Sequence, residues 1–306
     1  MEKDRILSIL QENYDYKITD IEFLRDSGGI VYIVNSTEQK FLLKITKKAF
    51  QDTILQSVKV ICYLFENNFP VPAVIKTKAG TPILEISKEK EKYLFILYEY
   101  IQGKEPELTL YAKKAGQLAG QLHKLLCDYK GDLVKREFYF FIERYIDILR
   151  EKEYSRINDY ADLGKKLWEH VKDSPMGVCH GDFHRGNLLE TAGGKLYLID
   201  FDTVCIAPRM FDIVTMCDIT DYFHLKSDDI KTTAKVYKNF LTGYVSENYL
   251  SEVEQSSFQY WAAIRHFQLQ ATIVEVYGID CIDNHFIDEQ LKWLKSWCEQ
   301  SPVIFI

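Results

Sequence analysis

The spacing of apolar residues changes near residue 101. Before it, short apolar or alternating runs are separated by Gly, Asn, Pro and charged residues, which is typical of strands and turns. These runs predict strands at residues 21–24, 30–34, 41–45, 83–86 and 93–100. Helical spacing occurs over residues 4–13 and 51–67. In the second of these helices, five residues are predicted to share one apolar face: Ile54, Val58, Ile61, Leu64 and Phe65.

After residue 103 the spacing becomes mainly helical. Helical periodicity covers residues 108–129, 138–153, 156–172 and most of 228–300, and a short strand–loop–strand segment lies within 179–202. The pattern therefore predicts an α+β chain of two parts. The first part, residues 1–101, is a sheet with one helix, and the second, residues 102–306, is mainly helical.

The composition narrows the class of protein. The 306 residues are 47% hydrophobic and 27% charged, which is ordinary for a globular protein. The net charge is −7 and no block rich in Lys or Arg occurs, so a nucleic-acid partner is not expected, whereas a cationic substrate is compatible. No apolar run reaches the length of about 18 residues that a membrane span needs, and the N-terminus lacks the apolar region of a signal peptide.

The cysteines indicate a reducing compartment. The seven cysteines are irregularly spaced and form no Cys-x-x-Cys pair. Neither a zinc site nor a disulfide framework is therefore indicated. Reduced thiols and a cytoplasmic location are expected.

Two neighbouring motifs carry the strongest chemical signal. The first is the segment His-Gly-Asp-Phe-His-Arg-Gly-Asn at 180–187, and the second is Leu-Tyr-Leu-Ile-Asp-Phe-Asp at 196–202. Phosphoryl transfer requires one carboxylate to orient the attacking hydroxyl and further oxygen ligands for magnesium. Asp182, Asn187 and Asp200 supply such a set, with Asp200 at the end of a predicted buried strand. Because Asp, Asn and Gly are also common in turns, either motif alone could be only a turn.

Both motifs resemble the catalytic loop and metal-binding segment of the aminoglycoside phosphotransferase and choline kinase superfamily, which is related to the protein kinases. The resemblance extends over about residues 18–215 in the family's order. It implies a bilobal, protein-kinase-like fold with a small N-lobe, made of an antiparallel sheet and a helix, and a larger helical C-lobe. It further implies that Asp182 is the catalytic carboxylate, that Asn187 and Asp200 bind Mg²⁺, and that ATP or GTP is the co-substrate.

The same resemblance assigns residues to the nucleotide. Ser27, Gly28 and Gly29 lie between two predicted strands, where a phosphate-covering loop belongs, although a plain hairpin turn fits the same residues. Lys44 resembles the strand lysine that pairs with the α- and β-phosphates; a solvent-facing lysine is the alternative.

A further segment, residues 99–103, resembles the hinge of the family. There the Glu99 carbonyl and the Ile101 N–H would bond the purine, with Tyr98 just inside. His123, in a segment like the family's long helix, is interpreted as a core histidine, and Asp212 as a structural residue that steadies the catalytic loop.

Three positions depart from the family's pattern. No Glu stands on the first-lobe helix where protein kinases hold the strand lysine, so the partner of Lys44 is left open, with Asp52 or Gln56 as candidates. Arg185 replaces a frequent Pro. Asp202 replaces the Gly of Asp-Phe-Gly and is a candidate metal ligand or substrate contact.

Acidic and aromatic residues in the C-terminal part bear on the acceptor substrate. An aminoglycoside or a similar amine-bearing compound is favoured because many acidic residues follow Asp212 and would attract a cation. The alternative, which is better for most of these residues, is that they lie on solvated helix faces. Aromatic side chains could also cage a quaternary ammonium group, although such residues are more often core: Tyr222, Phe223, Trp261, Trp293 and Trp297. The alternatives are a metabolic kinase for choline, homoserine or a sugar-like alcohol, a bacterial Ser/Thr protein kinase, and an inactive nucleotide-binding protein. The oligomeric state is left open.

Overall fold

The computed structural model describes residues 2–26, 29–47, 51–88, 91–226 and 228–305. The chain forms two compact units. The first comprises Met1–Glu105, Tyr129–Asp132 and Gly186–Val204, and the second comprises Pro106–Asp128, Leu133–Arg185 and Cys205–Ile306. The segment after the predicted catalytic loop therefore packs within the first unit, although it lies far from residue 105 in the sequence.

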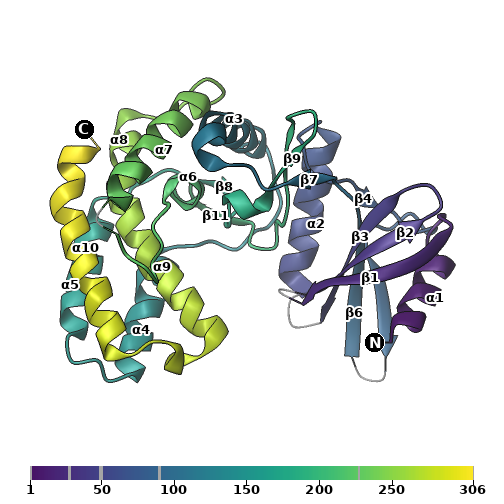
Figure 1. The fold of residues 1–306 in the computed structure, drawn as a ribbon, viewed down its shortest axis with the longest axis horizontal. Coiled ribbons are helices and arrows are strands. Elements are labelled where there is room, and N and C mark those ends of the chain that lie inside the picture. The colour runs from purple at the N-terminus through teal and green to yellow at the C-terminus, as the bar shows by residue number, and fades with distance from the viewer. Residues whose placement is uncertain (1, 27–28, 48–50, 89–90, 227, 306) are drawn as a thin grey trace. The chain divides into compact units, whose positions relative to one another are not determined.

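An antiparallel sheet forms the centre of the first unit (Figure 1). Its strand order is β1-β2-β3-β6-β4, and β5 also pairs with β6. The strands are β1 (Ile18–Asp26), β2 (Ile30–Ser36), β3 (Lys40–Lys47), β4 (Val74–Ile75), β5 (Leu84–Lys88) and β6 (Glu91–Glu99).

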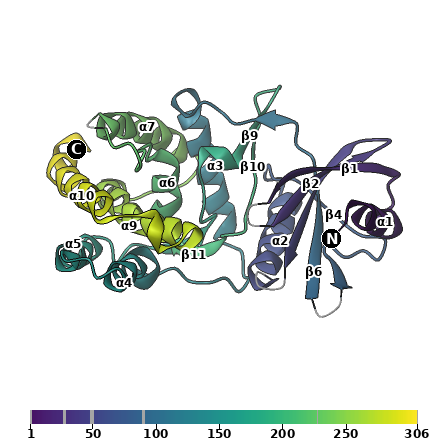
Figure 2. The same cartoon turned by 60° about the horizontal axis from the view of Figure 1, so that its bottom comes forward.

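The two faces of this sheet have different partners. Helix α1 (Lys3–Asn13) packs on one face, where its Ile6, Ile9 and Leu10 join a core that includes Phe41 and Leu43. Because successive strand residues point to opposite faces, the neighbouring residues of β3 point to the other face. Helix α2 (Gln51–Glu66) lies on that second side in both views (Figures 1 and 2).

A small three-stranded sheet completes the first unit. It pairs β7 (Gly103–Lys104), β9 (Leu188–Thr191) and β10 (Leu196–Leu198) in the order β10-β9-β7. The backbone N–H of Leu198 donates to the Pro70 carbonyl (2.9 Å), and that of Ile199 donates to the Asn187 carbonyl (3.0 Å). The first bond holds the segment that contains Asp200 and Asp202 against the first part of the chain, and the second ties this segment to Asn187.

The second unit is mainly helical. Its helices are α3 (Leu108–Leu126), α4 (Arg144–Glu151), α5 (Ile157–Glu169), α6 (Met210–Cys217), α7 (Asp229–Tyr244), α8 (Glu252–Ser256), α9 (Phe258–Tyr277) and α10 (Asn284–Ile304). A π-helical turn at Tyr139–Glu143 precedes α4, and short 3-10 turns occur at Arg185–Asn187 and Ile279–Cys281. One antiparallel pair joins β8 (Met176–Cys179) to β11 (Cys205–Pro208). Figure 2 shows α9 and α10 side by side.

Helices α3 and α7 approach each other closely enough to require glycine. A Cβ atom added to Gly116 would lie 2.0 Å from the Phe240 carbonyl oxygen, and one added to Gly243 would lie 1.9 Å from that of Lys113. Gly120 makes a similar approach, with 2.8 Å to the Tyr244 carbonyl oxygen. The contact fixes α3, which carries His123, against α7, which carries Tyr244.

The predicted fold class is confirmed: an antiparallel sheet with helices is followed by a helical C-terminal part. The placement of Phe65 on the apolar face of its helix is wrong, because this side chain is 49% exposed while Ile54, Val58 and Leu64 are buried. Among the described residues, no helix combines the length and apolar character needed to cross a membrane.

Candidate functional site

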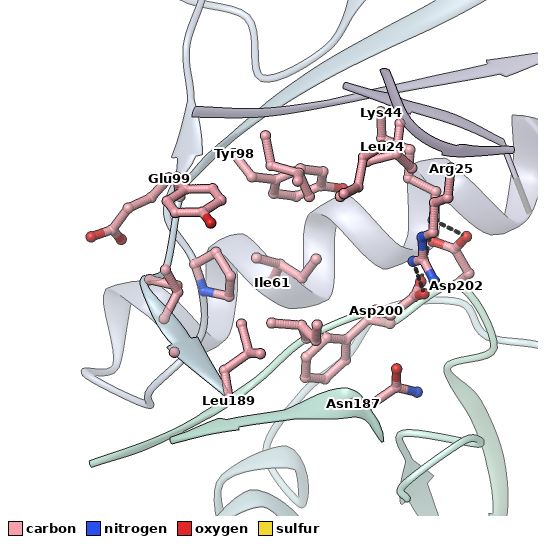
Figure 3. Close-up of a pocket in the computed structure, with 18 of the residues that line it drawn as sticks. Leu24, Arg25, Lys44, Ile61, Tyr98, Glu99, Asn187, Leu189, Asp200 and Asp202 are labelled. Atoms are coloured by element: carbon pink, nitrogen blue, oxygen red, sulfur yellow. Dashed lines mark hydrogen bonds and ion pairs between the residues drawn. The ribbon is translucent and has the colours of Figure 1, made fainter. Parts of the chain in front are cut away.

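A cavity of about 450 Å³ opens in the first unit, on the face of the sheet that carries α2 (Figure 3). Its volume lies within the range of small-molecule sites, roughly 300–1,000 Å³. The cavity brings together predicted site residues from three parts of the sequence: Lys44, Tyr98, Glu99, Ile101, Asn187 and Asp200.

One region of the cavity is apolar. Leu42, Ile61 and Leu189 line it together with the ring of Tyr98 and the segment Glu99–Ile101. Tyr98 is 8% exposed, and burial together with the nearby Asp202 raises the pKa of its phenol well above the ordinary value. The phenol is therefore protonated at neutral pH, and this part of the cavity presents a flat, uncharged surface suited to an aromatic base.

The other region is charged. The Lys44 ammonium donates to Asp200 Oδ1 (3.2 Å) and to Asp202 Oδ2, and its side chain is 8% exposed. The Arg25 guanidinium donates to Asp200 Oδ2 (3.0 Å). These contacts answer the open question about the partner of Lys44. It is the pair Asp200 and Asp202, whereas the side chain of the candidate Asp52 lies outside the described residues.

The two carboxylates titrate differently. Burial alone would raise the pKa of Asp200, but Lys44 and Arg25 outweigh it and hold this pKa below its ordinary value. Burial raises the pKa of Asp202, and repulsion by the Asp200 carboxylate raises it further. The attraction of Lys44 lowers this pKa but does not cancel the rise. Asp200 is thus the carboxylate that its surroundings keep ionised.

The backbone at Asp200 is unusual. Its φ of 65° lies in the left-handed region, which few non-glycine residues adopt, although Asp tolerates it better than most. Residues held in sparsely populated conformations cluster at functional sites. Here the conformation occurs two residues after the end of β10, and the Asp200 carboxylate lies beside Lys44 and Arg25.

The donor set at this end of the cavity fits a hard divalent cation. The carboxylates of Asp200 and Asp202 and the carboxamide of Asn187 line the same cavity, and Figure 3 shows Asn187 on the side of Asp200. Oxygen atoms are the ligands that Mg²⁺ and Ca²⁺ prefer. Asn187 is 7% exposed, so the residues packed around it restrict the orientation of its carboxamide.

The predicted phosphate loop is described only in part. Ser27 and Gly28 lie outside the described residues. Gly29 has φ 133°, and a Cβ added there would lie 3.0 Å from the Ile45 carbonyl oxygen and 3.6 Å from Lys44 Cε. The backbone at Gly29 therefore lies close to Ile45 and Lys44, and its positive φ is a conformation that glycine adopts readily.

Asp182 belongs to the second unit, where a hydrogen-bond network holds its loop. The backbone N–H groups of His180 and Gly181 donate to the two carboxylate oxygens of Asp212 (2.7 and 2.9 Å). The Asp182 backbone N–H donates a hydrogen bond to His180 Nδ1 (3.3 Å). Its carboxylate is about half exposed and lies 3.3 Å from the His184 imidazole, so it is open to an approaching molecule.

The network continues into the core through His123. His123 Nε2 donates to Asp212 Oδ2 (3.1 Å), and its other ring nitrogen pairs with the Tyr244 hydroxyl (2.9 Å). His123 and Asp212 are both buried. The interpretation of His123 as a core histidine is confirmed, and Asp212 makes the contacts expected of a residue that steadies the loop.

Sequence reasoning missed Arg25 and the apolar residues that line the cavity. Strand alternation offers a signal for Leu42, because it lies two residues from Lys44 and faces the same side. Several of the C-terminal residues considered for a cationic acceptor have structural roles. Trp261 and Trp297 are buried in the core, and Asp218 is buried and paired with Tyr222 Oη (2.5 Å) and Arg265 (3.4 Å).

Comparison with known proteins identifies relatives over most of the chain. The family model described as "Phosphotransferase enzyme family" matches residues 24–250. Among curated proteins, the chain is 19% identical to the amicoumacin kinase of Bacillus subtilis (strain 168), with 92% of this chain and 87% of that protein covered. It is 24% identical to the homoserine kinase of Zymomonas mobilis, with 74% and 71% covered.

A solved structure shows the same fold. It is described as amicoumacin kinase hAmiN in complex with AMP-PNP, Ca²⁺ and Ami, and its TM-score against this chain is 0.76 at 19% identity. The alignment covers 97% of this chain and 93% of that one.

Proposed function

This chain belongs to the phosphotransferase enzyme family, and from that premise we propose that it is a kinase that moves the γ-phosphate of ATP or GTP to a hydroxyl group of a small molecule. The observation that carries the proposal is the cavity of the first unit. It combines an apolar region with Lys44, Asn187 and Asp200 in one space. A nucleotide needs both features, because its base is flat and uncharged and its phosphates are strongly anionic.

The purine is proposed to bind beside Tyr98. The Glu99 carbonyl and the Ile101 N–H would bond its edge, and Leu42, Ile61 and Leu189 would cover its faces. Lys44 would then contact the phosphates, and the turn at Gly29 would bring backbone N–H groups toward the phosphate oxygens.

Asp200 and Asn187 are proposed to hold Mg²⁺, with Asp202 as a further candidate, since all three offer oxygen donors to the cavity. A bound divalent ion would neutralise phosphate charge during transfer. The complex of the similar hAmiN structure with AMP-PNP and Ca²⁺ supports the use of a nucleotide and a divalent metal.

Asp182 is proposed as the catalytic residue. Its half-exposed carboxylate would accept a hydrogen bond from the acceptor hydroxyl and orient it for attack. Because phosphoryl transfer is largely dissociative, orientation is its main task. The bonds from His180 and Gly181 to Asp212 keep the loop in place for that task.

The acceptor is proposed to be an amine-bearing alcohol of the antibiotic type, such as an aminoglycoside. Similarity to amicoumacin kinase supports an acceptor of this type. Similarity to homoserine kinase supports the second candidate function, that of a metabolic kinase for a small alcohol such as homoserine. A protein Ser/Thr acceptor and an inactive nucleotide-binding protein are the remaining alternatives.

A panel assay separates these alternatives. Purified protein is incubated with ATP or GTP, Mg²⁺ and one acceptor at a time: amicoumacin, several aminoglycosides, homoserine, choline and a generic protein substrate. Phosphorylated acceptor is detected by mass spectrometry, with Asp200→Ala as the inactive control. We expect transfer to one amine-bearing small molecule. Nucleotide binding without transfer to any acceptor, or transfer to the protein alone, would contradict the proposal.

A further inference from the structure

Arg25 makes a contact in the cavity that none of the assigned roles explains. It lies near the end of β1, immediately before the turn to β2, and its guanidinium donates to Asp200 Oδ2. Lys44 reaches the other oxygen of the same carboxylate. Both oxygens of the proposed metal ligand Asp200 are therefore covered by cations of the protein itself.

The two cations are held very differently. The Lys44 side chain is 8% exposed and contacts two carboxylates, so it is fixed. The Arg25 side chain is 48% exposed and contacts one. An exposed ion pair of this kind contributes little to stability, so Arg25 can exchange its partner at small cost.

The formal charges show what the exchange would achieve. Arg25, Lys44, Asp200 and Asp202 are two cations and two anions, so this end of the cavity is neutral as it stands. A divalent cation on Asp200 would repel Arg25 from that carboxylate. The triphosphate that accompanies the cation offers Arg25 negatively charged oxygens, which a planar guanidinium group can bind in a bidentate manner.

The position of Arg25 suits this second partner. Arg25 and Lys44 both line the cavity, and each contacts one oxygen of the Asp200 carboxylate. Arg25 and Lys44 therefore reach the same space from β1 and β3. A phosphate group that contacts Lys44 would lie within the range of a long arginine side chain.

We propose that Arg25 is a phosphate-recognition residue of the nucleotide site that occupies the metal-binding carboxylate Asp200 until the metal–nucleotide complex replaces it. This inference rests on the proposed function. It assigns Arg25 two opposite effects: it weakens the binding of a divalent cation alone, and it strengthens the binding of the metal–nucleotide complex.

The test compares the wild type with Arg25→Met, Arg25→Lys and the control Arg5→Met. The control removes the same charge from the exposed face of α1, outside the cavity lining. Titration calorimetry measures the affinity for Mg²⁺·ATP, for Mg²⁺·GTP and for adenosine and guanosine. Electron paramagnetic resonance measures Mn²⁺ binding without nucleotide.

We expect Arg25→Met to weaken binding of the preferred Mg²⁺–nucleotide about ten- to hundredfold, which is the worth of a charge-assisted hydrogen bond. Nucleoside binding should not change. Mn²⁺ alone should bind about fivefold more tightly, because one neighbouring positive charge is gone. Arg25→Lys should restore part of both effects, and Arg5→Met should resemble the wild type.

Unchanged Mg²⁺–nucleotide affinity in Arg25→Met would overturn the inference, as would an equal loss of nucleoside affinity, which indicates a change in the fold of the cavity. Both outcomes leave the proposed function intact. A wild type that binds no nucleotide would instead refute the proposed function.

Discussion

Replacing Asp212 by Asn should be among the most damaging single-atom changes in the second unit. Asp212 is completely buried and accepts three hydrogen bonds, from His180 N (2.7 Å), Gly181 N (2.9 Å) and His123 Nε2 (3.1 Å). A carboxamide keeps one acceptor oxygen and turns an NH₂ group toward the remaining donors. At least one buried N–H then loses its partner.

The expected loss follows from these contacts. An unsatisfied buried donor costs about 1–3 kcal/mol, and the hydrogen bonds that remain are weakened because their acceptor loses its charge. We therefore expect Asp212→Asn to lower the free energy of unfolding by about 1–3 kcal/mol or more. Because the lost bonds anchor the loop immediately before Asp182, turnover should also fall about tenfold or more in the protein that remains folded.

Urea denaturation followed by circular dichroism measures the stability change, and turnover is measured at a temperature where the variant is fully folded. The matched control is Asp228→Asn, whose side chain is 84% exposed and lies 3.8 Å from Lys231. The control should change the free energy of unfolding by less than about 0.5 kcal/mol. A loss below about 1 kcal/mol in Asp212→Asn, with normal turnover, would refute the argument that Asp212 anchors the loop.

Three further predictions concern other parts of the molecule. Burial and the nearby Arg265 lower the pKa of His266 from 6.5 to about 3, so the unfolded chain binds a proton that the folded chain does not between these pH values. The free energy of unfolding should therefore fall as pH drops from 7 to 4.5. In urea denaturation, His266→Gln should reduce that fall by roughly 2–3 kcal/mol. An identical pH dependence in the variant would contradict the assignment of this fall to His266. Gly243→Ala should force α7 away from the Lys113 carbonyl, destabilise the fold by about 1–3 kcal/mol or more and lower the melting temperature. The control Gly193→Ala should leave the melting temperature unchanged, because Gly193 has room for a Cβ atom. Equal melting temperatures for both variants would refute the close contact between α3 and α7. Tyr98→Ala should weaken nucleotide binding about tenfold in calorimetry while Tyr98→Phe keeps it, and unchanged affinity in the alanine variant would remove Tyr98 from the proposed purine site.

The sequence predicted those parts of the fold that depend on local spacing. The strand at 41–45 and the helix at 51–67 match β3 (Lys40–Lys47) and α2 (Gln51–Glu66) closely, because alternation and helical periodicity are local signals. It did not predict β4 (Val74–Ile75) or β7 (Gly103–Lys104). Two residues are too few to show a period, and both strands exist only through pairing with distant partners.

The candidate site likewise combines residues that local motifs predicted with contacts that depend on long-range packing. Motif spacing was enough to select Lys44, Asn187 and Asp200, which line one cavity. The partner of Lys44 could not be predicted, since it lies more than 150 positions away and is reached only when β10 is paired within the first unit. Arg25 carried no motif at all, and its contact with Asp200 depends on the same long-range packing.

Phe65 illustrates the limit of helical periodicity. Leu64 and Phe65 are adjacent, so they lie about 100° apart around the helix, and the sequence alone does not show how wide the buried face is. In the structure Leu64 is fully buried and Phe65 is 49% exposed. The width of the buried face is set by the sheet against which α2 packs.

The substitution Asp182→Asn tests the central proposal most directly, because it keeps the shape of the side chain and removes only its charge. Turnover with the best acceptor and nucleotide affinity are measured on the same preparation, beside the exposed-turn control Asp173→Asn. We predict that Asp182→Asn loses at least about a hundredfold in turnover, as expected for a positioned acid–base group, while nucleotide affinity stays within about twofold of the wild type. Turnover near that of the wild type would contradict the assignment of Asp182 as the residue that orients the acceptor hydroxyl.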